Sequence, residues 1–155
     1  SKSDYEIVSE TAKTLEKFGV KYELIISSAH RSPKRTSEYV ANAEKKGAKV
    51  FIAAAGMAAH LAGAIAANTT KPVIGIPMAG SALSGVDALY STVQMPSGMP
   101  VATLAIGKAG AINAAYLAVQ ILALEDERLA SALKADREAK IKALEEDSSK
   151  VEVIL

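Results

Sequence analysis

The sequence predicts a single α/β domain in which a parallel β-sheet is covered by helices on both faces. Short apolar runs alternate with helical patterns along the chain. These runs are apolar throughout, as expected of strands that are buried on both faces. The length of 155 residues suits one domain, which would bury roughly 70% of the surface of the unfolded chain. No internal repeat or linker divides the chain, so residues 1–155 are expected to form one unit.

Each element has its own signal. The first helix is predicted over residues 4–18, with Leu15 and Phe18 on its apolar face and Gly19 as its stop. Gly47 ends the second helix in the same way. The predicted strands are 22–27, 49–54, 72–77 and 100–106, and the further helices are 33–46, 58–68, 85–93 and 109–124.

The carboxyl-terminal part has a different pattern. Residues 125–147 are charged and amphipathic, which predicts a helix that either packs on a neighbouring subunit or forms a solvated surface. Ser148 and Ser149 are expected to break this helix, and residues 150–155 are predicted to form a short strand.

The amino-terminal part begins with a helix, although a doubly wound sheet begins with a buried central strand. Residues 1–4 resemble the loop that follows such a strand. Two interpretations remain: the first strand is missing from the sequence, or residues 151–155 supply it in a rearranged order. We favour the first.

Composition excludes several classes of function. A formal net charge of +1 provides no basic field for nucleic acid or an anionic membrane. The chain has no cysteine, which excludes disulfides and thiolate metal sites and fits a cytoplasmic location. No apolar run approaches 18 residues, and no charged-then-apolar leader is present, so the sequence predicts neither membrane insertion nor secretion.

The strongest candidate for chemistry is the pair His30 and Arg31, at the end of the predicted strand 22–27. Ser32 and Pro33 follow as an N-cap and first helical residue. Open α/β sheets bind their ligands at the carboxyl ends of strands. Imidazole can give and take a proton near neutral pH, and Arg31 can bind phosphate through two hydrogen bonds. A structural histidine beside a surface charge is the competing interpretation.

Two further segments lie at predicted helix starts. The start of the first helix could hold a phosphate through Ser1, Ser3 and Asp4. Asp4 could also accept hydrogen bonds from ribose hydroxyls. The competing interpretation is that these residues form a plain N-cap. The Gly/Ala-rich turn around Gly56 would let the backbone approach a substrate, but it lacks the three-glycine dinucleotide spacing. His60 falls within the next predicted helix and is either a buried structural donor or a site group.

Residues 81–87 and 94–100 are rich in serine, proline and glycine and suggest loops near the site, one of them a possible lid. The sequence contains neither a Walker A loop nor a zinc-type histidine cluster. NTP hydrolysis and metal catalysis are therefore unsupported.

Taken together, these segments resemble the class I N5-carboxyaminoimidazole ribonucleotide mutases, the family also called phosphoribosylaminoimidazole carboxylase, catalytic subunit. The motifs run in the family's order from Ser1 to about Leu124. The matching segments are Ser1-Lys2-Ser3-Asp4, Ser28-Ala29-His30-Arg31-Ser32-Pro33, Ala58-Ala59-His60-Leu61, Ala82-Leu83-Ser84-Gly85-Val86-Asp87, Val93-Gln94-Met95-Pro96 and Gly107-Lys108-Ala109-Gly110.

The resemblance implies a flavodoxin-like three-layer αβα sandwich, assembled as a homo-octamer, with no cofactor and no metal. It implies interconversion of N5-carboxyaminoimidazole ribonucleotide and 4-carboxy-5-aminoimidazole ribonucleotide through trapped CO2. His30 would be the acid/base, and the substrate would be bound by Ser1, Ser3, Asp4, Ser28, Ala29, Arg31, Gly56, Ala58, His60 and Leu61.

Three departures from the family pattern stand out. The family's first strand is absent before Ser1. Ala54 and Met57 stand where the family usually has glycine, and Ala62 where it usually has proline. The alternatives are a carboxylase that uses free CO2, disfavoured by Arg31 where those enzymes usually carry lysine, and a non-catalytic nucleotide-binding module.

Overall fold

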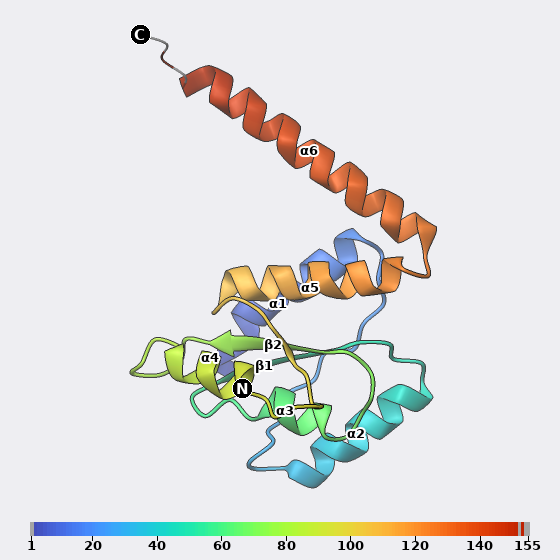
Figure 1. Ribbon diagram of the computed structural model, residues 1–155, viewed down its shortest axis with the longest axis vertical. Helices are drawn as coiled ribbons and strands as arrows, with labels where there is room; N and C mark the ends of the chain where they lie inside the picture. Colours follow the sequence, from blue (N-terminus) through green and yellow to red (C-terminus); the bar gives the residue numbers. More distant parts are fainter. Residues whose placement is uncertain (1, 152, 154–155) are drawn as a thin grey trace.

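The computed structural model describes residues 2–151 and 153, and it shows a small parallel sheet with helices on both faces (Figure 1). The strands are β1 (Phe51–Gly56), β2 (Val73–Met78) and β3 (Ala102–Thr103), in the order β1-β2-β3. The helices are η1 (Lys2–Asp4), α1 (Tyr5–Lys17), α2 (Pro33–Lys45), α3 (Leu61–Ala66), α4 (Val86–Val93), α5 (Lys108–Ala123) and α6 (Glu127–Val151). The predicted α/β class, the parallel sheet and the carboxyl-terminal helix are confirmed.

One face of the sheet is covered by α1 and α5. Alternate residues of β2, Ile74, Ile76 and Met78, point to this face, because successive side chains of a strand point to opposite faces. They pack against a row of buried alanines on α5: Ala111, Ala114, Ala115 and Ala118. The small side chains let α5 lie close to both the sheet and α1.

The other face is covered by α2, α3 and α4. Phe51 and Ala53 of β1 pack there against Val40 of α2 and Ile65 of α3. Gly75 of β2 lies opposite α4, where an added Cβ would come within 2.4 Å of a Thr92 methyl carbon. All six residues of β2 are therefore buried, as predicted for a central strand.

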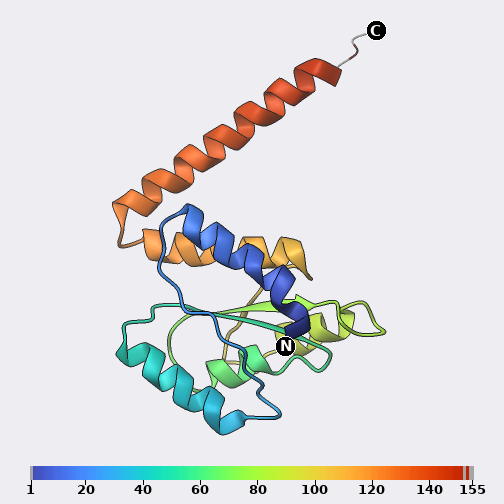
Figure 2. The same ribbon diagram turned by 180° about the vertical axis from the view of Figure 1, so that it is seen from behind.

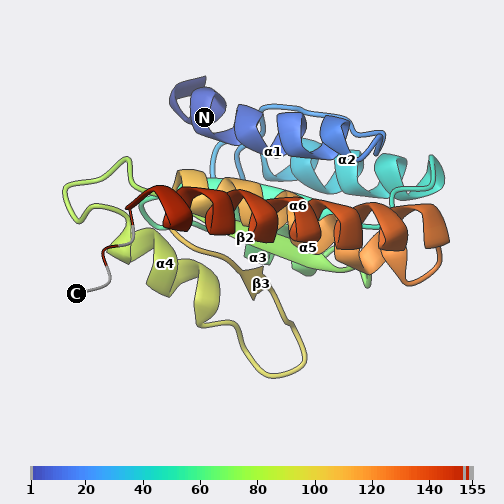
Figure 3. The same cartoon turned by 90° about the horizontal axis from the view of Figure 1, so that it is seen from above.

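The prediction of a strand over residues 22–27 is wrong in this structure. The segment is extended but belongs to no sheet, and it runs from α1 past the sheet to α2 (Figure 2). The physical reason is a gap: a groove of about 630 Å³ separates this segment from β1, so the two backbones cannot form a ladder. Figure 3 places α1 and α2 along one edge of the sheet and α4 beyond the other.

The carboxyl-terminal predictions also need correction. The strand expected over 100–106 is reduced to Ala102–Thr103, although Leu104 and Gly107 still donate to β2 carbonyls. Ser148 and Ser149 do not break α6, which continues to Val151 and extends away from the sheet (Figure 1). Serine costs a helix only about 0.5 kcal/mol relative to alanine, too little to end it.

Lys150 and Val151 are thus helical, which contradicts the part of the predicted strand 150–155 that the structure describes. Residues 152, 154 and 155 of that prediction lie outside the described residues. Across the described part of the chain, no helix has the length and apolar character needed to cross a membrane.

Candidate functional site

The loop that carries His30 and Arg31 is tied to the start of α2. The Ser32 amide donates to the Ser28 carbonyl at 2.9 Å, and the Arg31 amide donates to Ser28 Oγ at 3.2 Å. Ser32 stands at the predicted N-cap position with Pro33 after it. Its hydroxyl donates to the Ser28 carbonyl at 3.1 Å instead of capping the helix. The predicted N-cap position of Ser32 is therefore confirmed, but the capping hydrogen bond is not formed.

A second turn, after β1, carries Gly56 and His60. Gly56 ends β1 beside Met78 of β2, and an added Cβ would come within 3.3 Å of the Met78 carbonyl oxygen. Met57 then takes a φ of 59°, a left-handed conformation that bulky residues rarely adopt. This explains in physical terms why glycine suits the position. The Ala59 amide donates to the Met57 carbonyl at 2.8 Å and closes the turn.

The two turns meet at one edge of the sheet. The imidazole rings of His30 and His60 lie with their centroids 5.4 Å apart at an angle of 40°. Both side chains are exposed, and His60 is the residue that precedes α3 rather than one inside it. The interpretation of His60 as a buried structural donor is therefore wrong. Two groups that can exchange protons lie side by side, next to the Arg31 guanidinium in sequence.

The remaining predicted site residues lie partly in these two turns and partly around a cavity whose lining includes neither His30 nor His60. Ser28 and Ala29 are half-buried in the His30 loop, whereas Ala58 is exposed in the second turn. Leu61 begins α3 and lines a cavity of about 740 Å³.

The amino-terminal candidates reach the same cavity. Asp4 lines it from the start of α1, and Ser3 lies in the preceding turn, where its hydroxyl donates to Asp4 Oδ1 at 3.4 Å. Ser1 lies outside the described residues. Asp4 occupies the N-cap position of α1 without a capping bond from its side chain, so the plain N-cap interpretation is not supported.

Sequence reasoning missed Arg35, which also lines this cavity, together with Ser27. No sequence signal set Arg35 apart, because it is one of several exposed charged residues of α2, beside Lys34 and Glu38.

The Ser81–Asp87 loop forms a compact turn in which Ser81 Oγ donates to Asp87 Oδ1 at 2.8 Å. Ser84 has a φ of 52° and is, after Met57, the second residue other than glycine with a left-handed backbone conformation among the described residues. The structure describes no group of three or more His, Asp or Glu side chains that could hold a metal ion.

Comparison with known proteins accounts for these features. A family model described as AIR carboxylase matches residues 1–143. A Haemophilus influenzae protein named N5-carboxyaminoimidazole ribonucleotide mutase is 54% identical over 138 residues, which is 89% of this chain and 84% of that protein. Proteins of the same name from Bacillus subtilis and Escherichia coli K12 are each 52% identical, over 89% and 90% of this chain and 85% and 82% of those proteins.

Among solved structures, Treponema denticola PurE superposes with a TM-score of 0.87 at 28% identity, covering 99% of this chain and 94% of that one. The three layers described above are therefore those of a flavodoxin-like α/β fold. With nine-tenths of its length matched by the family model, the chain belongs to the AIR carboxylase family.

Proposed function

We propose that the protein is a mutase of purine biosynthesis. It interconverts N5-carboxyaminoimidazole ribonucleotide and 4-carboxy-5-aminoimidazole ribonucleotide. The identity of more than 50% to several proteins of that name supports this activity. The observation that carries the chemistry is the meeting of the His30-Arg31 loop with the Gly56–His60 turn, at the carboxyl end of β1.

In this proposal His30 is the acid/base. The N–C bond of the carbamate breaks to release CO2, and the amine nitrogen takes up a proton. C4 of the aminoimidazole ring then attacks the trapped CO2 and forms a C–C bond, and His30 removes the C4 proton. One proton is taken up and one released, so no oxidant, reductant or cofactor is consumed.

The other residues bind and orient the substrate. Arg31, Ser1 and Ser3 would hold the phosphate, because a guanidinium and backbone amides at a helix start both favour an anion. Asp4 would accept hydrogen bonds from the ribose hydroxyls. Ser28, Ala29, Gly56, Ala58, His60 and Leu61 would line the base and carboxylate.

Retaining CO2 requires a site that excludes water. In one chain both His30 and His60 are exposed. Three apolar side chains within residues 83–90 are exposed as well: Leu83, Val86 and Tyr90 are 64%, 43% and 63% exposed. Closure by neighbouring subunits of a homo-octamer would meet this requirement, and we include that assembly in the proposal. Mass measurement by light scattering tests it, and a monomer at micromolar concentration would contradict it. We also place the protein in the cytoplasm.

The decisive experiment replaces His30 with asparagine, which keeps a polar side chain but cannot exchange a proton near neutral pH. We expect unchanged thermal unfolding and retained substrate binding, with turnover reduced at least a hundredfold. A normally active variant would contradict the role of His30. Initial rates from the N-carboxylated substrate, compared with rates from aminoimidazole ribonucleotide plus bicarbonate, separate the mutase from a carboxylase that uses free CO2.

A further inference from the structure

Met57 carries the one large side chain in the turn of residues 56–59, which leads from β1 toward α3. The other three positions are glycine or alanine. Gly56 has no space for a side chain, because an added Cβ would come within 3.3 Å of the Met78 carbonyl oxygen. Ala59 is buried, at 3% exposure. The long side chain therefore stands alone among small neighbours.

The position of Met57 is unfavourable for the stability of the fold. Its φ of 59° is one that glycine adopts freely and that costs any other residue free energy. Its side chain is 63% exposed, so it buries little apolar surface in return. A strained backbone with so little packing around its side chain points to a functional role rather than a structural one.

The strained residue lies close to the two histidines. Met57 precedes His60 by three residues, so their Cα atoms are at most about 11 Å apart. The hydrogen bond from the Ala59 amide to the Met57 carbonyl folds the turn and shortens this separation. The imidazole of His60 in turn lies 5.4 Å from that of His30, between ring centroids. An unbranched side chain at position 57 can therefore reach the surface beside both rings.

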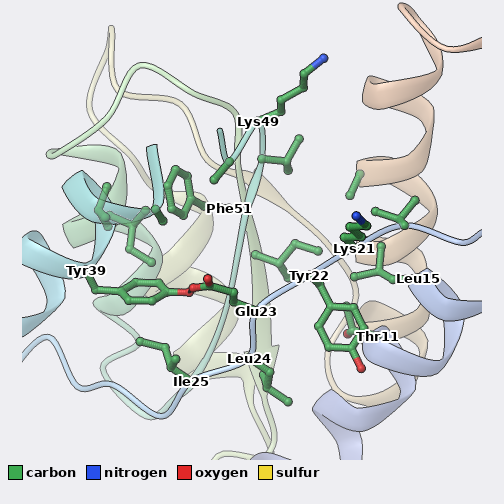
Figure 4. Close-up of a pocket in the computed structure, with 18 of the residues that line it drawn as sticks. Thr11, Leu15, Lys21, Tyr22, Glu23, Leu24, Ile25, Tyr39, Lys49 and Phe51 are labelled. Carbon is green, nitrogen blue, oxygen red and sulfur yellow. The ribbon is translucent and has the colours of Figure 1, made fainter. Parts of the chain in front are cut away.

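That surface lies outside the two cavities of the single chain. The groove of about 630 Å³ lies between segment 20–27 and β1, among side chains such as Tyr39 and Phe51 (Figure 4). Its lining includes neither His30 nor His60, and neither does the lining of the cavity of about 740 Å³. Both histidines are exposed. A reaction beside them needs a cover that these hollows do not supply.

We propose that the Met57 side chain covers the reacting carboxyl group and keeps the released CO2 beside the aminoimidazole ring. This inference rests on the proposed mutase activity. Met57 moves no proton in this role. It determines specificity, because it favours transfer of the carboxyl group within one substrate over exchange with CO2 from solution.

The chemistry of the side chain suits this role. CO2 has no net charge, so a cation such as Arg31 cannot hold it as it would hold phosphate. Apolar groups that exclude water must retain it instead. A methionine side chain is flexible and polarisable, so it can turn aside to admit the ribonucleotide and then pack over it. The glycine and alanines of the same turn are too short to do so.

The test measures how often trapped CO2 escapes during turnover. The protein converts unlabelled N5-carboxyaminoimidazole ribonucleotide in ¹³C-bicarbonate, with carbonic anhydrase present to supply labelled CO2. Each escape releases one unlabelled CO2. It then leaves free aminoimidazole ribonucleotide or is followed by C–C bond formation with labelled CO2. Mass spectrometry counts both products at initial rates, after subtraction of the rate without protein.

Three substitutions separate the side chain from the backbone strain. We expect Met57→Gly and Met57→Ala to raise the escaping fraction at least about threefold, because both remove the cover. Met57→Leu is the matched control, since it keeps an apolar side chain of similar size, and its escaping fraction should stay close to that of the unchanged protein. Met57→Gly should not lower the thermal midpoint, because glycine adopts a φ of 59° without strain.

Equal escape in all four proteins would overturn the proposal. So would a lower mass of Met57→Gly in light scattering, which would assign the side chain to packing between copies of the chain. If the unchanged protein does not convert the N-carboxylated substrate, the proposed mutase activity itself is wrong, and the inference fails with it. Turnover by the unchanged protein thus distinguishes the two failures.

Discussion

Asp136 on α6 is the charged residue whose replacement has the most calculable effect on stability. Its side chain is only 9% exposed and accepts hydrogen bonds from Lys17 of α1, from Lys140 at 3.1 Å and from the Tyr116 hydroxyl of α5 at 2.7 Å. Burial raises the pKa of this carboxyl. The hydrogen bonds from Lys17, Tyr116 and Lys140 lower the pKa by more than burial raises it, so it falls from 3.8 to about 2. The carboxylate therefore joins three helices.

The size of the effect follows from this pKa. Each unit of difference between folded and unfolded states corresponds to about 1.4 kcal/mol, so the full shift would amount to about 2.4 kcal/mol. The two lysines are more than half exposed, and solvent screens their charges, which reduces the expected contribution to about 1–2 kcal/mol. Asp136→Asn should lower the free energy of unfolding by that amount at pH 7.

The sign of the pH dependence is a second test of the same residue. Because the folded pKa is depressed, the contribution of Asp136 is complete above about pH 5 and is lost as the pH falls toward 2. About half of it should be gone at pH 3. Urea unfolding of both proteins at pH 7 and pH 3 measures the difference.

The control is Asp147→Asn. Its carboxylate is 77% exposed and accepts one hydrogen bond, from Lys150 at 3.2 Å, so we expect a change below about 0.5 kcal/mol. The reasoning is refuted if Asp136→Asn matches this control at pH 7. It is refuted equally if its deficit stays the same at pH 3.

Three other substitutions test the packing and the site. Gly110→Ala should cost at least about 3 kcal/mol in urea unfolding, since its Cβ would fall 1.7 Å from a backbone oxygen, whereas Gly80→Ala meets nothing within 4 Å and should be neutral. Ile74→Ala empties a fully buried position and should cost about 2–5 kcal/mol, against less than about 0.5 kcal/mol for Leu124→Ala at 85% exposure. Arg31→Gln should raise KM for the ribonucleotide about tenfold in the turnover assay and change kcat less, if the guanidinium binds phosphate.

The helices were the most predictable part of the fold because their signals are local. The apolar face ending at Leu15 and Phe18, and Pro33 at a first turn, each placed a helix to within a few residues. The strands were less predictable, because a strand forms only by hydrogen bonding to another strand, and the local sequence does not show which segment lies beside it. Residues 22–27 have a strand's composition, yet without a backbone beside them they form no ladder.

The end of α6 shows a different limit of the sequence argument. Ser148 and Ser149 were expected to stop the helix, but serine disfavours a helix interior only weakly. The Ser149 hydroxyl donates to the Glu146 carbonyl at 2.8 Å within the continuing helix. Nearly all of residues 141–150 are exposed where α6 projects away from the sheet (Figure 1).

The approach of the two turns could be predicted from topology. Placing His30 and Gly56 at the carboxyl ends of extended segments brought their turns to one edge, and the 5.4 Å approach of His30 and His60 agrees with that. The exposure of His60 was not predictable, because it depends on α3 beginning at Leu61, three residues later than the pattern indicates. A turn closed by the hydrogen bond from the Ala59 amide to the Met57 carbonyl took up those three residues.

The loop that carries His30 is held in place by α2 rather than by the sheet. Ser27 Oγ lies 2.8 Å from Thr36 Oγ1, which donates to the Ser32 carbonyl at 3.1 Å, and Thr36 is buried. These bonds hold the loop although the segment before it has no ladder.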